Sequence, residues 1–393
     1  MKICGASVFG ADLQFHDDDI RISDGVFASP DEIVKPDNGG AFEKEEETVL
    51  RADDCYAIPG LIDIHFHGAL NADVCDEDPA VFEKIAVYEA SAGVTAICPA
   101  TLTLPVPALE HVLSLGAAFA ASPHPGADLV GFNMEGPFIS RAKKGAQNEK
   151  YIRQCDVQTA ERFYQASGGL LKIIGLAPEE NPGYAAFIRS VRKKMRVSLA
   201  HTNADYDTAM QAFSAGASHA VHLYNAMSGL NHREPGVVGA VSDSPSVFAE
   251  IITDGIHVHP AAVRAAFRMN GEERMVLISD SLRCTGMPDG DYLLGGQTVV
   301  KQGRHCTLKK EGNLAGSVSN LADCMRTAVL EMKIPLETAV RCASINPARA
   351  IGIDDRYGSI EAGKKADVVL LRKDSALSLA AVVKDGEVIV NHL

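Results

Sequence analysis

The sequence predicts an α/β fold, a TIM (β/α)8 barrel joined to a small β-sandwich domain that both chain ends build. The length supports this, because the chain has 393 residues and a barrel takes about 250 of them, which leaves room for a companion domain. Apolar strand-like runs alternate with amphipathic helical segments through the middle of the chain. Both ends, in contrast, are rich in short β-strand patterns.

The two ends of the chain are expected to share one domain. Turn residues separate short strands near residues 2–9, 21–27 and 48–51, and the acidic run at 43–47 is expected to be a solvated loop. Near the C-terminus, strands are expected at 366–371 and 380–390, with a hairpin-type turn at 384–387. We therefore assign residues 1–56 and 355–393 to the small β-sandwich domain and residues 57–354 to the barrel.

The middle of the chain contains eight candidate strands, as a barrel requires. They lie at residues 58–64, 94–99, 129–134, 170–176, 197–200, 219–223, 248–252 and 275–278, with amphipathic helical segments such as 79–92, 159–167, 184–194 and 205–215 between them. Their regular spacing favours a closed barrel over a doubly wound open sheet. The longer segment 281–314 is expected to cover the barrel mouth, and helices at 318–332 and 336–345 lead back to the small domain.

Composition excludes several classes of partner. With 37 basic and 51 acidic residues the net charge is −14, and no basic stripe is present to bind nucleic acid or a membrane surface. The sequence contains no run of about 18 apolar residues, so no transmembrane helix is expected. The nine cysteines are scattered without a C-x-x-C pair, which favours reduced thiols in a cytoplasmic enzyme.

Metal-competent side chains gather where the predicted strands end, the position at which barrel enzymes place their catalytic groups. His65 and His67 follow the first strand, and residues two apart in an extended chain project to the same side. Of the other candidates, Glu135, His201 and Asp280 end three further strands, and another strand reaches His222. Any one of them alone has an ordinary structural explanation, but their coincidence predicts a site for Zn²⁺, Fe²⁺, Mn²⁺ or Co²⁺. Lys172, near the start of the fourth strand, is interpreted as a structural charged residue.

Longer motifs give a family resemblance. PGLIDIHFHG at residues 59–68 and GSIEAGKKAD at 358–367 resemble the amidohydrolase superfamily. More narrowly, the chain resembles the N-acetylglucosamine-6-phosphate deacetylase family, and the match covers essentially the whole chain in order. The matching pieces are MEGPF (134–138), KGA (144–146), LAPE (176–179), AHTNA (200–204), HLYNAM (222–227), REPG (233–236), DGIH (254–257) and SD (279–280).

This resemblance implies a metal centre and a catalytic group. Glu135, His201 and His222 would bind one divalent metal, and Asp280 would be the catalytic acid and base. Some members lack the two strand-one histidines and hold one ion, whereas His65 and His67 here permit a second ion shared with Glu135. One or two ions per subunit therefore remain open, with zinc expected before iron, manganese or cobalt.

The resemblance also implies substrate contacts. Asn225, Ala226, Arg233 and His257 would hold the sugar and its phosphate, and Leu314, Ala315 and Gly316 would line the acetamide pocket. Arginine binds two phosphate oxygens at once, so Arg233 is the expected anchor, either in its own site or in a neighbouring subunit's site, as in a homodimer. Many members carry histidine where this chain has Gln147, which can hold a sugar hydroxyl but no charge.

The implied activity is metal-dependent hydrolysis of the N-acetyl group of N-acetyl-D-glucosamine 6-phosphate, giving D-glucosamine 6-phosphate and acetate in amino sugar catabolism. A metal lowers the pKa of water from about 15.7 towards 7, and Asp280 would take the proton and pass it to the leaving amine. Three alternatives stay open. They are a deacetylase for the galactosamine or mannosamine form, an amidohydrolase for a cyclic amide or N-acyl amino acid, and a non-catalytic barrel.

Overall fold

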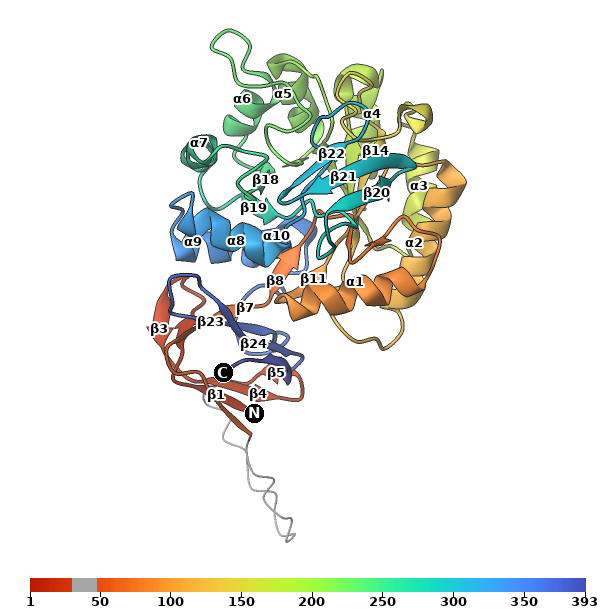
Figure 1. Cartoon of the computed structure of the whole chain (residues 1–393). Helices are drawn as coiled ribbons and strands as arrows, with labels where there is room; N and C mark the ends of the chain where they lie inside the picture. Colours follow the sequence, from red (N-terminus) through yellow and green to blue (C-terminus); the bar gives the residue numbers. More distant parts are fainter. Residues whose placement is uncertain (30–47) are drawn as a thin grey trace.

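The computed structural model describes residues 1–29 and 48–393. It consists of a barrel surrounded by helices and a smaller domain rich in strands, which contains both chain termini (Figure 1). The expected loop at 43–47 lies outside the described residues. The predicted fold class is confirmed, while the exact division at residues 56/57 and 354/355 stays a prediction.

Two sheets form the small domain, and both ends of the chain contribute to it. One sheet has the order β5 (Val26–Phe27), β4 (Ile20–Ser23), β1 (Lys2–Cys4) and β6 (Val49–Arg51), and the other has β25 (Glu387–Asn391), β24 (Leu379–Lys384), β23 (Val368–Arg372), β7 (Cys55–Pro59), β2 (Ser7–Phe9) and β3 (Phe15–Asp17). The antiparallel pair β7–β23 joins the two ends in one ladder. Ile3, Ile22, Leu370 and Val383 pack in the core between the sheets.

Parallel strands follow one another around the barrel. They are β8 (Leu61–Asp63), β11 (Val94–Ile97) with β12 (Ala100–Thr101), β13 (Asp128–Leu129) with β14 (Phe132–Phe138), β15 (Leu171–Leu176), β16 (Arg196–Leu199), β17 (His219–Ala220), β18 (Phe248–Ile252) and β19 (Met275–Ile278). The Asp280 amide donates to the His65 carbonyl over 2.9 Å, which links the chain after β19 to the chain after β8.

The first barrel strand is shorter than the sequence predicted. Residues 58 and 59 pair with the small domain instead, and β8 begins after Gly60. A Cβ atom at Gly60 would lie 2.1 Å from Thr95 Oγ1 and 2.9 Å from Asp367 Cβ. The chain therefore passes from one domain to the other through a gap that only glycine fits.

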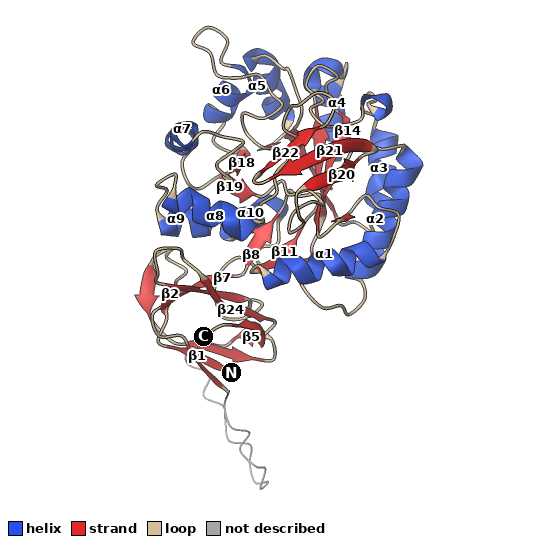
Figure 2. Ribbon diagram, in the orientation of Figure 1, coloured by secondary structure: helices blue, strands red, loops and turns tan. Residues whose placement is uncertain are grey.

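Helices form the outer layer of the barrel (Figure 2). They are α1 (Ala80–Ser91), α2 (Val106–Ala120), α3 (Val157–Ala166), α4 (Tyr184–Val191), α5 (Tyr206–Ala215), α6 (Gly236–Ser242), α7 (Pro260–Asn270), α8 (Leu321–Leu330), α9 (Leu336–Ala343) and α10 (Ile345–Ile351), with 3₁₀ turns at Glu149–Tyr151 and Pro178–Glu180. Asp156 and Asp205 cap α3 and α5 by accepting from the amides of Thr159 and Thr208, as helix N-termini require.

The long segment after β19 folds into an antiparallel sheet of β20 (Gly290–Leu294), β21 (Gln297–Gln302) and β22 (His305–Leu308). Leu294, Val299 and Leu308 pack against Leu102 and Leu282 beside the barrel mouth, which is the cover that the sequence predicted. A short hairpin of β9 (Gly68–Ala69) and β10 (Ala72–Asp73) lies after the first strand.

All nine cysteines are free, as expected. Among the described residues, no helix combines the length and the apolar character needed to cross a membrane.

Candidate metal centre and substrate cavity

The predicted ligands come from five barrel strands, but not all of them stand where the strands end. His65 and His67 follow β8, His201 follows β16, and Asp280 lies two residues beyond β19. Glu135 lies inside β14, which continues to Phe138, and β17 ends at Ala220, before His222. The expected strand ends at Glu135 and beyond His222 are therefore wrong, although both side chains reach the centre.

Three of these residues have a left-handed backbone. The φ angles are +42° at His201, +26° at His222 and +50° at Asp280. Non-glycine residues rarely adopt this conformation, at a cost of about 1–3 kcal/mol each. Each bend occurs where the chain leaves a strand, and the surrounding barrel must stabilise it.

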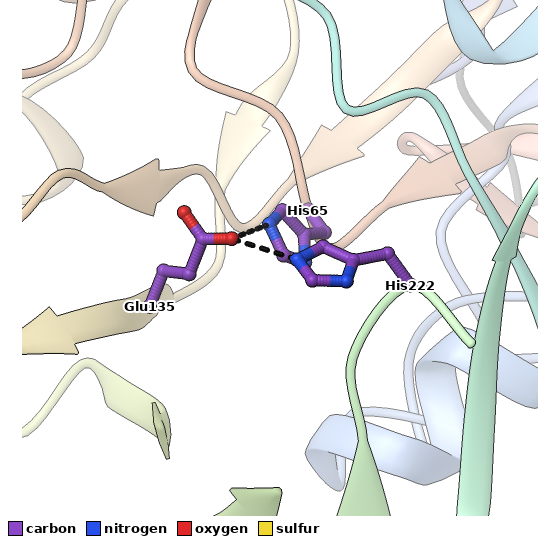
Figure 3. Close-up of side chains that lie close together, drawn as sticks. All are labelled: His65, Glu135 and His222. Carbon is purple, nitrogen blue, oxygen red and sulfur yellow. Dashed lines mark hydrogen bonds and ion pairs between the residues drawn. The ribbon is translucent and has the colours of Figure 1, made fainter. Parts of the chain in front are cut away.

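The imidazoles converge on one carboxylate. Glu135 Oε1 lies 2.7 Å from His201 Nε2. The same oxygen lies 2.9 Å from His222 Nε2 and 3.5 Å from His65 Nε2 (Figure 3). His67 Nε2 lies 3.5 Å from Glu135 Oε2 and 3.3 Å from an oxygen of Asp280. All six predicted groups therefore form one cluster, with Glu135 at its centre.

The opposite ring nitrogen of each histidine is occupied. Nδ1 of His67, His201 and His222 lies 3.1, 2.8 and 3.0 Å from the backbone carbonyls of Ala100, Lys143 and Asn225. A carbonyl accepts only from an N–H, which assigns the proton to Nδ1 and leaves the Nε2 lone pairs facing the cluster.

The fourth histidine makes a different contact. His65 Nδ1 lies 2.7 Å from a carboxylate oxygen of Glu250, and His65 Nε2, although fully buried, has no hydrogen-bond partner among the described residues. An orphaned ring nitrogen beside further imidazoles and carboxylates is the donor set of a divalent metal site. The residues present therefore fit such an ion, and His65 can join either Glu135 and His222 or His67 and Asp280 around it.

Electrostatics hold the carboxylates in their charged form. Burial alone raises the pKa of Glu135, but His201, His222 and His65 outweigh it and keep that pKa well below its usual range. Burial likewise raises the pKa of Glu250, and His65 and His219 lower it to about 2. Glu135 is therefore anionic in the folded protein, which is the form that binds a cation.

Glu250 and His219 are functional candidates that the sequence analysis missed. Both are fully buried inside the barrel, and His219 Nε2 lies 2.8 Å from Glu250 Oε1. The signal was present, because Glu250 is a charged residue within an otherwise apolar buried strand, and such a residue needs polar partners.

A cavity of about 540 Å³ opens above the cluster. It is lined by most of the predicted residues, namely His67, Glu135, Gln147, His201, His222, Asn225, Ala226, His257, Asp280, Leu314, Ala315 and Gly316. His65 lies beneath it, fully buried. Lys143 and Lys144 also line it; they belong to the loop of the KGA motif but were not predicted to bind substrate.

Gln147 has a role that its sequence position did not reveal. Its side-chain oxygen accepts from the Thr103 amide over 2.6 Å, and its side-chain nitrogen donates to Glu135 Oε2. Both ends of the amide are thus engaged within the protein, and Gln147 orients the central carboxylate. Its predicted contact with a sugar hydroxyl stays a prediction.

His257 and Arg233 differ in their placement. His257 lines the cavity, and its Nδ1 lies 2.8 Å from Asp254 Oδ2. Burial alone lowers the pKa of His257, but the effect of Asp254 is larger and leaves that pKa raised. Arg233 is exposed and lines a separate cavity of about 630 Å³, which shares Lys143 with the first. Within one chain Arg233 is therefore not brought to the metal cluster, and Lys172 lies at the start of β15, away from it.

Comparison with known proteins identifies relatives along most of the chain. Residues 56–390 match the model of the amidohydrolase family. An N-acetylglucosamine-6-phosphate deacetylase from Bacillus subtilis (strain 168) is 36% identical over 329 residues, which are 83% of each chain. An N-acetylgalactosamine-6-phosphate deacetylase from Escherichia coli O157:H7 is 34% identical over 371 residues, 94% of each chain.

A solved structure has the same architecture. A mutant N-acetyl-D-glucosamine-6-phosphate deacetylase from Mycobacterium smegmatis, in complex with N-acetyl-D-glucosamine 6-phosphate, superimposes with a TM-score of 0.90. It is 27% identical, and the match covers 100% of this chain and 99% of that one.

Proposed function

The chain belongs to the amidohydrolase family, and on that premise we propose that it hydrolyses the N-acetyl group of N-acetylglucosamine 6-phosphate, giving acetate and glucosamine 6-phosphate. The observation that carries this proposal is the cluster of four imidazoles and two carboxylates beneath a cavity, in a chain whose relatives are hexosamine-phosphate deacetylases. The product amine and acetate place the enzyme in amino sugar catabolism.

A divalent cation is the cofactor. The family generally depends on such ions, and the cluster offers two overlapping ligand groups. We assign one position to Glu135, His201 and His222 and a second to His65, His67, Glu135 and Asp280, with zinc as the resident ion because imidazole and carboxylate ligands suit it. When bound, such an ion acidifies water and polarises a carbonyl oxygen.

Asp280 supplies proton transfer. Its carboxylate lines the cavity next to His67, so it can accept a proton as water attacks the acetamide carbon. The new carbon–oxygen bond forms acetate as the carbon–nitrogen bond breaks, and Asp280 returns the proton to the leaving amine. Leu314, Ala315 and Gly316 line the same cavity and suit the acetamide methyl group.

Cationic groups near the cavity suit the phosphate. His257, Lys143 and Lys144 line it directly. Arg233 is exposed in the neighbouring cavity, and we place it in the site of a second subunit, which makes the active form a homodimer. The nine free cysteines support a cytoplasmic location.

A second candidate is deacetylation of N-acetylgalactosamine 6-phosphate. The relative from Escherichia coli O157:H7 with that name matches 94% of the chain. Gln147, whose amide is engaged with Glu135 and Thr103, stands where many deacetylases of the glucosamine form carry histidine.

A side-by-side assay separates the two. Acetate release is measured for the glucosamine, galactosamine and mannosamine forms of the N-acetylhexosamine 6-phosphate, with metal analysis of the same anaerobically purified protein. The highest kcat/KM is expected for the glucosamine form. A higher value for the galactosamine form would replace the first candidate with the second, and no acetate from any of them would refute both.

A further inference from the structure

Glu250 is a buried carboxylate outside the expected ligand set. It lies in β18 and is fully buried inside the barrel. No lysine or arginine forms an ion pair with it among the described residues; its ion-pair partners are His65 and His219. A buried carboxylate is costly unless it is paired and hydrogen-bonded, so these contacts require an explanation.

The four histidines of the cluster are not equivalent. Three of them donate Nδ1–H to backbone carbonyls, whereas His65 donates to Glu250 over 2.7 Å. A carboxylate in this position fixes the tautomer and ring orientation of a metal-binding histidine and makes its other nitrogen a stronger ligand. Two buried ring nitrogens lack a hydrogen-bond partner among the described residues, His65 Nε2 within the cluster and Nδ1 of His219 outside it.

Glu250 is itself held on both oxygens. Oε2 accepts from His65 and, over 3.2 Å, from the backbone amide of His222, while Oε1 accepts from His219 Nε2. The Glu250 carboxylate therefore contacts the side chain of one proposed ligand, His65, and the backbone of a second, His222. His219 fixes the carboxylate through Oε1, whereas His65 contacts Oε2.

We propose that Glu250, anchored by His219, is a positioning residue that sets the metal affinity of the centre by acting through His65. This inference requires the proposed function only in that His65 binds the metal. It predicts that the charge of Glu250, rather than its volume, determines how tightly the ion is held.

The test measures zinc affinity by competition with a chromophoric chelator. Glu250→Gln keeps the volume and removes the charge, and zinc at the position that includes His65 should bind about 10–100-fold less tightly. Glu89→Gln is the control for replacing a fully buried carboxyl group by an amide, because Glu89 has no bond to any histidine of the cluster. That control should bind zinc as the parent does, and an unchanged affinity in Glu250→Gln would overturn the proposal.

A double-mutant cycle shows whether Glu250 acts through His65. In a His65→Asn background, adding Glu250→Gln should change zinc affinity by no more than about twofold, since the intermediate residue is gone. An equal loss in both backgrounds indicates a general structural effect and refutes the proposal. If Glu250→Gln does not fold, Glu250→Asp, which keeps the charge but shortens the side chain by one methylene and so lengthens its contact with His65, carries the same comparison.

This readout is independent of substrate. If no acetate is released but the double-mutant cycle gives the predicted zinc affinities, the proposed function is refuted and the inference stands. If acetate is released normally but zinc affinity is unchanged in the Glu250 variants, the inference is refuted and the proposed function stands.

Discussion

At the scale of single residues, the centre combines backbone strain with exact side-chain placement. His201, His222 and Asp280 all have positive φ, and His201 and His222 point Nε2 at Glu135. Strained residues persist only where the surrounding structure stabilises them. Here the backbone hydrogen bonds of Asp280 to His65 and Ser317 do so.

Asp280→Asn should lower kcat by roughly 10²–10⁴-fold, because an amide cannot accept and return the proton of the attacking water. The ion held by Glu135, His201 and His222 should remain, since those ligands are unchanged. The measurement is acetate release together with zinc content per chain. Near-normal turnover in a zinc-loaded variant would show that another group transfers the proton.

At the scale of elements, helix α1 carries an unusual residue towards the barrel. Glu89 is fully buried, and neither of its carboxylate oxygens has a hydrogen-bond partner among the described residues. Burial raises the pKa of Glu89 well above its usual range, and the charges of Asp63 and Asp323 raise it further. The folded protein therefore keeps Glu89 protonated at a pH where the unfolded chain releases the proton.

Glu89→Gln should be more stable than the parent protein, by a margin that grows as pH rises. Because the pKa is higher in the folded state, the parent loses stability between the unfolded pKa, near 4.3, and the folded pKa, by up to about 1.4 kcal/mol per pH unit. The variant cannot ionise and keeps this stability. Its free energy of unfolding should equal that of the parent near pH 4 and exceed it increasingly towards pH 7.

The control is Glu83→Gln, an exposed glutamate on the same helix. It should show no pH-dependent gain in denaturant titrations. A constant difference between Glu89→Gln and the parent at all pH values would mean that Glu89 is not protonated in the folded state.

At the scale of the whole molecule, the substrate is anionic although the chain carries a net charge of −14. Binding must therefore use local cations, and Lys143, Lys144 and His257 line the cavity. Arg233 lies outside it in the same chain, which is the arrangement expected if two copies complete each other's sites.

Subunit mixing tests this exchange. Arg233→Ala should raise KM for the phosphorylated substrate more than for the unphosphorylated sugar, since a guanidinium binds phosphate as a fork. Co-purified dimers of one Arg233→Ala and one Asp280→Asn chain should recover about one working site in two. That site takes Asp280 from one chain and Arg233 from the other.

If Arg233 serves its own chain, the mixed dimer has no complete site and shows no recovery. A monomer in sedimentation experiments, with full activity, would likewise contradict the exchange.

The sequence by itself determined the barrel, the shared domain of the two chain ends and the identities of the six clustered groups. It could do so because strand periodicity and motif position are local, and parallel strands bring their carboxyl ends together. Boundaries were less well determined. β14 extends past Glu135, and β8 begins only after Gly60, because neighbouring strands and the domain junction decide where pairing stops.

Only the tertiary structure decided how the cluster is supported. His65 and Glu250 are 185 positions apart, and Gln147 reaches Glu135 from a separate loop. Such pairs depend on how the strands face one another across the barrel interior, and residue spacing carries no record of that. The sequence indicated the six clustered groups, whereas the closed barrel decides what orients each of them. Glu250 orients His65, Gln147 orients Glu135, and backbone carbonyls orient the other three histidines.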